Sequence, residues 1–176
     1  MSGKLVGGFI ISVALIFAAV VYYYQIYGYY ETVEPNGQDD VVLTSRVSEM
    51  PEAILYEDFQ AIDATSSPIR FRACFITSMS QPLLTETYMA YDHAEPLVAP
   101  SWFDCFDAVE VGKALERGEA LAFLGTRNIQ YGIDRVVAVM PDGRGFVWHQ
   151  INECGEVVFD GKPAPAHCPP KPEAGQ

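Results

Sequence analysis

The sequence predicts an α+β protein, with one N-terminal transmembrane helix followed by a small domain that has an antiparallel β-sheet and at least one packed helix. Three observations support this fold class. Residues 5–24 form an uninterrupted apolar stretch, residues 108–117 read as a helix with recognisable ends, and residues 120–159 alternate strand-forming segments with turns. No strand–helix–strand rhythm calls for a parallel sheet, so an antiparallel arrangement is expected.

The apolar stretch is long enough to cross a membrane. At about 1.5 Å per residue, twenty helical residues span about 30 Å, which matches the hydrocarbon core of a bilayer. The stretch ends in tyrosines, whose rings favour the headgroup region: Tyr22, Tyr23, Tyr24, Tyr27, Tyr29 and Tyr30. We therefore expect a transmembrane helix over residues 5–27. A cleaved secretory signal is the alternative, although the apolar core of a signal is only about 7–15 residues long.

The distribution of basic residues predicts the orientation of this helix. Lys4 and the terminal amine precede the span, whereas the next basic residue is Arg46. Because basic residues resist translocation, residues 1–4 are expected to be cytoplasmic. In a bacterium this places the helix in the inner membrane and the C-terminal domain in the periplasm.

One half of the helix circumference is rich in small residues. They are Gly7, Gly8, Ser12, Ala14, Ala18 and Ala19. Small residues let helices approach closely in lipid, so we expect this face to pack against an integral membrane protein complex. The alternative is that Gly and Ala are simply common in membrane spans, and Ile11 and Leu15 lie in the same arc.

The domain that follows is strongly acidic. The chain has a formal net charge of −12, and its 23 acidic residues all follow residue 30. Such a surface is not expected to bind nucleic acid, which requires Lys and Arg to neutralise phosphates. It could attract a basic periplasmic protein such as a c-type cytochrome, or the acidity could serve only to keep an exported domain soluble.

The four cysteines agree with an oxidising compartment, because their number is even and no CxxC pair occurs. Three connectivities are open. We favour Cys74 with Cys105 and Cys154 with Cys168, since each pair encloses a compact segment.

A metal site is the alternative use of the second cysteine pair. His149 precedes Cys154 by five residues, and His167 is adjacent to Cys168. If these segments meet, two thiolates and two imidazoles could hold copper or zinc. Such a site needs reduced cysteines, which the expected compartment disfavours.

Residues 28–51 are polar and turn-prone, with a brief apolar run at residues 41–43. We expect them to form a tether that lifts the folded domain, residues 52–160, off the membrane. Proline is frequent in residues 161–176, so this C-terminal tail should be extended and tied to the domain through Cys168.

Within the domain, residues 69–76 alternate as a strand does, with Phe71 and Phe75 on one face and Arg70 and Arg72 on the other. The two arginines could form an anion site or pair with acidic neighbours across the sheet. The remaining strands are predicted from runs of strand-forming residues, and the turns from the Gly, Pro, Asn and Asp residues between them. Strands are expected at 54–62, 120–125, 129–140, 145–151 and 156–159, with turns at 126–128, 141–144 and 152–155.

A segment without clear periodicity, residues 78–102, is the best candidate for a recognition surface, because long irregular loops in compact domains are often functional. Its candidate contacts are Tyr88, Met89, Tyr91, His93 and Trp102. Ordinary packing is the alternative for these residues, and residues 82–91 could form a short helix. His93 stands beside Asp92 and Glu95, which is the setting of a general base or a metal ligand.

The helix that follows has both ends marked in the sequence. Asp107 and Glu110 have the spacing of a capping box, in which each side chain binds an amide at the other's position. Gly118 can adopt the left-handed conformation that ends a helix, so the helix is expected over residues 108–117.

The string LAFLGTRNIQYGIDRVVAVMPDGRGFVWHQINECGEVVFDG, within residues 120–168, resembles small membrane-anchored proteins of unknown function from alphaproteobacteria. The resemblance implies an inner-membrane protein with a periplasmic domain, and it transfers no catalytic residues.

None of the common catalytic motifs occurs in the sequence, neither a phosphate-binding loop nor GxSxG, SxxK, HExxH or CxxC. We therefore expect no catalytic residues, no enzyme activity and no cofactor. The expected function is that of a non-catalytic accessory or assembly subunit of a respiratory or photosynthetic membrane complex. A periplasmic copper chaperone-like protein and a membrane-anchored sensor or ligand-binding domain are the alternatives.

Overall fold

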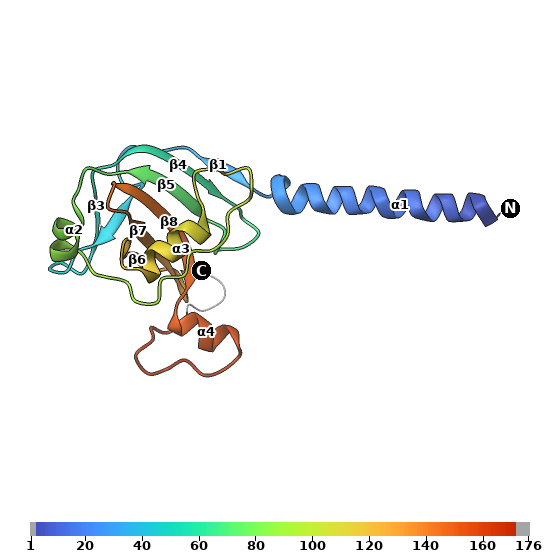
Figure 1. Ribbon diagram of the computed structural model, residues 1–176. Helices are drawn as coiled ribbons and strands as arrows, with labels where there is room; N and C mark the ends of the chain where they lie inside the picture. The colour runs from blue at the N-terminus through green and yellow to red at the C-terminus, as the bar shows by residue number, and fades with distance from the viewer. Residues whose placement is uncertain (1–2, 172–176) are drawn as a thin grey trace.

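The computed structural model describes residues 3–171 and consists of a long N-terminal helix that projects from a β-rich domain (Figure 1). The helix α1 (Gly3–Tyr23) continues into a π-helical turn, η1 (Tyr24–Gly28). No residue of α1 is buried within this chain. The helix is long and apolar enough for a membrane anchor, and a signal peptide would have the same character.

The domain is built on a six-stranded antiparallel sheet with the order β1-β4-β5-β8-β7-β6. Its strands are β1 (Glu31–Val33), β4 (Glu57–Asp63), β5 (Arg72–Ile76), β6 (Leu121–Gln130), β7 (Ile133–Val139) and β8 (Arg144–Ile151). A second, two-stranded sheet pairs β2 (Val42–Thr44) with β3 (Pro51–Ala53). The helices are α2 (Gln81–Thr87), α3 (Ala108–Glu116) and α4 (Glu153–Phe159). The predicted α+β class is confirmed.

Both faces of the large sheet are buried, each under a different cover. On one face Phe75 and Val147 pack with Leu43 from β2 and Leu84 from α2. On the other face Trp148 and Phe146 pack with Val111 from α3 and with Phe103 and Phe106 from the preceding loop. Because side chains alternate along a strand, neighbouring residues of β5 serve the two layers, as its sequence alternation predicts.

The segment predicted as a tether, residues 28–51, is instead part of the folded domain. Val41 and Leu43 are 1% and 0% exposed and belong to the core under the first face of the sheet. Strand β1 pairs with β4 along residues 31–33. The apolar run at residues 41–43 is short, but a three-residue strand needs no more to cover a sheet, so the polar residues around it misled the prediction.

Two further predictions were wrong: the strand at residues 156–159 and the turn at residues 126–128. Residues 156–159 lie in helix α4, because Asn152 caps the helix by accepting a hydrogen bond from the Gly155 amide at 3.0 Å. Strand β6 continues through the expected turn at 126–128, and the chain reverses at Gly132, whose φ of +79° suits glycine. The register between β6 and β7 shifts twice in this stretch, between Leu124 and Thr126 and between Thr126 and Gln130.

The ends of α3 agree with the sequence. The Asp107 carboxylate accepts hydrogen bonds from the amides of Val109 and Glu110. The other half of the expected capping box is absent from the described hydrogen bonds, since the Glu110 carboxylate pairs with Arg144 at 2.9 Å. Glu110 thereby joins α3 to the first residue of β8.

Replacing Leu43 with alanine tests whether the segment before β3 belongs to the core. We expect the Leu43→Ala variant to lose about 2–5 kcal/mol of unfolding free energy, because the side chain leaves a cavity. Chemical denaturation of the full chain in detergent measures the change. Val47→Ala, at a position 94% exposed, is the control and should change stability by less than about 0.5 kcal/mol. If Leu43→Ala changed the unfolding free energy as little as Val47→Ala, the result would support the prediction that residues 28–51 are a tether outside the core.

Candidate functional site

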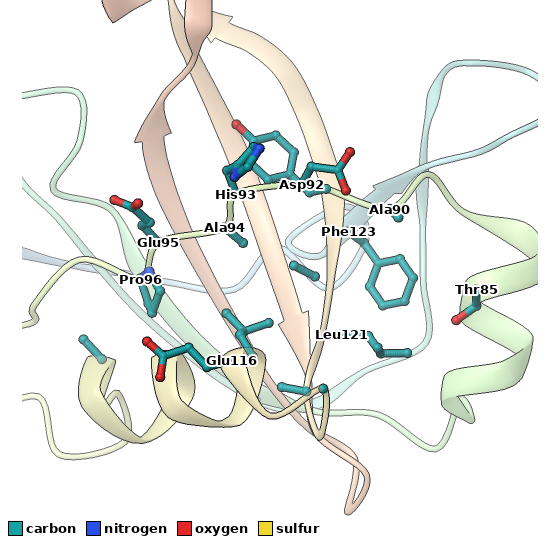
Figure 2. Close-up of a pocket in the computed structure, with 17 residues that line it drawn as sticks. Thr85, Ala90, Asp92, His93, Ala94, Glu95, Pro96, Glu116, Leu121 and Phe123 are labelled. Atoms are coloured by element: carbon teal, nitrogen blue, oxygen red, sulfur yellow. The ribbon is translucent and has the colours of Figure 1, made fainter.

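A groove of about 680 Å³ opens between residues 90–96, helix α3 and the start of strand β6 (Figure 2). This volume falls within the usual range for small-ligand sites. Its lining is largely apolar and rich in small residues. The small lining residues are Ala90, Ala94, Ala108, Gly112, Gly118, Ala120 and Ala122, with Pro96, Leu115, Leu121 and Phe123 as the larger apolar ones. The hollow exists because glycine and alanine side chains do not fill the space between α3 and the sheet edge.

Carboxylates stand at the rim of the groove. Asp92, Glu95 and Glu116 line it together with His93, and no Lys or Arg is among its lining residues. All four side chains are exposed. Among the described ion pairs none involves these three carboxylates, so their negative charge faces the groove mouth uncompensated.

The wall of the groove formed by residues 90–96 is fixed to the sheet at two points. The Tyr91 amide donates to the Ala122 carbonyl at 2.9 Å, which attaches the wall to the edge of β6. The side chain of Gln150 on β8 accepts from the Glu95 amide and donates to the His93 carbonyl, both at 2.8 Å. His93 has a φ of +56°, in the left-handed region that few residues other than glycine adopt, and the hydrogen bond from Gln150 to its carbonyl helps to hold it there.

A buried polar network supports the groove from below. Asp134 accepts hydrogen bonds from the Tyr91 hydroxyl at 3.3 Å, the Asn128 amide at 2.8 Å and the Asn152 side chain at 2.7 Å. Burial and the negative charge of Asp134 raise the pKa of Tyr91, so this phenol stays protonated. The sequence analysis missed this network, because its members are far apart in the chain and no spacing joins them.

The expected recognition residues do not form one surface. Tyr88 is buried in the core, and Met89 lies between β2 and β6, where its amide donates to the Thr44 carbonyl. Tyr91 and His93 line the groove. Trp102 lies elsewhere, against the end of the N-terminal helix. Ordinary packing therefore accounts for part of this set.

Trp102 joins the domain to the helix. Its indole N–H donates to the Ile26 carbonyl at 2.8 Å. Its ring stacks on Tyr27 with centroids 6.2 Å apart and meets Tyr30 edge to face at 6.0 Å. Two of the six tyrosines predicted as a headgroup belt therefore form part of the contact between the helix end and the domain.

Arg72 and a disulfide hold the loop that carries Trp102. Arg72 is 4% exposed and donates to the carbonyls of Leu97 at 2.7 Å and Val98 at 3.2 Å. Burial lowers the pKa of Arg72 to about 10, so it remains charged at neutral pH. The Cys74–Cys105 disulfide ties the other end of the loop to β5. Neither use that the sequence offered for Arg72, an anion site or an acidic partner, is realised.

The second disulfide joins Cys154 to Cys168, which is the pairing that the spacing favours. His167 lies near it, with its imidazole and the two sulfurs within 4.8 Å of one another. His149 does not join this cluster. With both sulfurs in a disulfide the cluster offers no thiolate, so the four-residue metal set of the sequence analysis is not assembled.

His149 is buried on β8, with both ring nitrogens occupied. Its Nδ1–H donates to the Pro68 carbonyl at 2.8 Å, and its Nε2 accepts from Arg135 at 3.1 Å. The ring stacks on Phe71 with centroids 4.9 Å apart. Burial and the positive charge of Arg135 lower the pKa of His149 to about 4, so the neutral imidazole is a structural element of the core.

A comparison with known sequence families places the domain. A family of unknown function, DUF6446, matches residues 41–169. The chain belongs to this family. The DUF6446 match includes the groove and both disulfides and begins after α1 and β1. No curated protein and no solved structure matches the chain.

The buried His149 predicts a stability that depends on pH. Between pH 6.5 and pH 4 the unfolded chain takes up a proton at this residue and the native chain does not. Its contribution is therefore complete above pH 6.5 and is lost as the pH falls, by about 3 kcal/mol in total.

Denaturation at a series of pH values measures this effect as the difference between the wild type and His149→Gln, because carboxylates titrate in the same window in both. The curve of His149→Gln should be flatter between pH 6.5 and pH 4. His93→Gln, at an exposed histidine, is the control and should follow the wild type. If the unfolding free energy of His149→Gln fell with pH as steeply as that of the wild type, His149 would not be the source of the pH dependence.

Proposed function

We propose that this protein is a non-catalytic accessory or assembly subunit of an inner-membrane complex of the respiratory or photosynthetic kind. In this proposal α1 is a retained anchor with a cytoplasmic N-terminus, and the DUF6446 domain lies in the periplasm. The helix packs against an integral membrane partner through its small-residue face. The domain acts as a binding module on the same complex.

The contact between Trp102 and the helix end is the observation that carries this proposal. It couples the domain to α1, so that a partner bound along the helix meets the domain in one orientation. An anchor that only retained an independent domain at the membrane would need no such contact. Cleavage of a signal would remove the apolar helix that this contact orients.

Two further features support an exported accessory role. Two disulfides suit an oxidising compartment. No residue of α1 is buried within the chain, and a carbon atom added at Gly7 or Gly8 would meet nothing within 4 Å. The helix therefore has its whole small-residue face available for a neighbour in the bilayer.

The alternatives differ in their support. A copper chaperone would need Cys154 and Cys168 reduced and a further ligand in place of His149, whose nitrogens are both occupied. A membrane-anchored sensor or ligand-binding domain is favoured by one specific observation, the groove of about 680 Å³ beside β6. A binding role for the groove is compatible with the accessory function.

Affinity purification from native membranes in mild detergent tests the proposal, with mass spectrometry of the proteins recovered. One oxidase, reductase or photosynthetic complex should be recovered reproducibly with the wild-type chain. Gly8→Ile should reduce that recovery at least fivefold, because the branched side chain keeps helices apart. Val20→Ile, outside the small-residue face, is the matched control and should not reduce it. Recovery of the protein alone, or equal losses in both variants, would contradict the proposal.

A further inference from the structure

We infer that the groove beside β6 binds an extended, basic segment of a partner protein, with Lys or Arg stems on the apolar lining and their charged ends at the acidic rim. This inference rests on the proposed accessory function and specifies the kind of partner that the domain contacts. It is argued from the lining, the charge and the rigidity of the groove.

The lining suits long aliphatic stems better than a compact ligand. Leu115 from α3 and Leu121 from β6, both half-buried, supply apolar surface along the groove, with the buried Phe123 ring beneath them. Lys and Arg side chains place their methylene stems on such surface while the charged end remains in water. The small residues around Ala90 leave room for a backbone to approach this surface.

The carboxylates at the rim determine which charge a segment bound in the groove can carry. Glu116 stands on the α3 side, and Asp92 and Glu95 stand on the opposite wall, as Figure 2 shows. Since no Lys or Arg lines the groove, an anionic segment would meet only repulsion. The domain as a whole attracts cations at long range, because the chain has a net charge of −12.

The groove is preformed, which reduces the entropic cost of binding. Gln150 clamps the wall at His93 and Glu95, and the Tyr91 amide attaches it to β6. On the facing side, a carbon atom added at Gly112 would lie at an ordinary packing distance, 3.7 Å, from the Pro96 ring, so α3 and the wall lie close together at this point.

A defined peptide tests the inference on the full chain in nanodiscs of zwitterionic lipid. The probe is a fluorescein-labelled peptide of four Lys-Ala repeats, and binding is followed by anisotropy, with empty nanodiscs as the blank. We expect binding that weakens with salt. The corresponding Glu-Ala peptide should not bind. Failure of the Lys-Ala peptide to bind would overturn the inference.

Variants locate the binding at the groove. Removing two rim charges in Glu95→Gln with Glu116→Gln should weaken binding about three- to tenfold, as expected for two exposed ion pairs. The matched control replaces Glu34 and Glu57 with glutamine, two exposed carboxylates that do not line the groove, and should leave binding within twofold. Ala90→Phe, which fills the groove at an exposed position, should abolish it. If the two double variants weakened peptide binding equally, the assignment of the binding site to the groove would be overturned.

The length of the basic side chain tests the role of the apolar lining. A peptide with diaminobutyric acid in place of lysine keeps the charge and lacks two methylenes per side chain, so it should bind at least fivefold more weakly. Equal affinity would overturn the role of the stems. Displacement of the Lys-Ala peptide by an equimolar amount of spermidine would overturn the assignment to a peptide and indicate a small polyamine.

The outcomes separate this inference from the proposed function. Peptide binding is measured on the isolated protein, whereas recovery of a membrane complex depends on the α1 face around Gly8. If the complex is recovered but the peptide does not bind, only the groove assignment is overturned. If the peptide binds but no complex is recovered, the accessory function is overturned and the domain is a peptide-binding domain.

Discussion

The attachment of residues 97–105 to strand β5 is the interaction on which the contact between the domain and the N-terminal helix depends. Arg72 and Cys74 point from β5 toward the same sheet face, where one binds the Leu97 and Val98 carbonyls and the other forms a disulfide with Cys105. The segment held in this way adjoins the groove wall at one end and presents Trp102 to the helix at the other. A buried arginine is costly unless its donors are bound, and backbone carbonyls supply the acceptors here. Arg72 and Cys74 therefore support the loop that carries Trp102, and this loop continues directly from the groove wall that Gln150 holds.

The rest of the fold follows from a sheet that must be covered on both faces. Short segments do the covering: β2 with α2 on one side, and α3 with the Phe103 and Phe106 rings on the other. Neither cover reaches far past the edge strand β6, and the small residues between α3 and that edge leave the groove open. The acidic residues of the groove stay at its rim, where water solvates them, and the buried Asp134 carboxylate beneath it is hydrogen-bonded to Asn128 and Asn152. The domain thus combines a closed core with a concave, negatively charged surface.

Local chemistry made part of this structure predictable. The apolar run of α1, the Asp107 cap of α3 and the alternation along β5 each act over a few residues, so the sequence carries them directly. The role of Val41 and Leu43 was missed because a three-residue strand in polar surroundings has no signal of its own until its sheet is known. The groove could not be predicted because it brings Ala90 close to Phe123 and α3, which are distant in the sequence. The role of Arg72 could not be predicted because its partners are backbone carbonyls, which every residue has. Such features depend on the tertiary arrangement and were beyond reach of spacing arguments.

Hydrogen–deuterium exchange of the Arg72→Met variant tests the central claim most directly, because methionine retains the apolar stem and removes the donors. The account predicts that residues 97–107, including the hydrogen-bonded amides of Phe103 and Phe106, exchange at least tenfold faster than in the wild type. Strands β7 and β8 should keep their protection, and Arg127→Met, at an exposed arginine, should match the wild type throughout. Unchanged exchange in residues 97–107 would contradict the account. A uniform acceleration across the whole sheet would also contradict it, since Arg72 would then support global stability and not this loop.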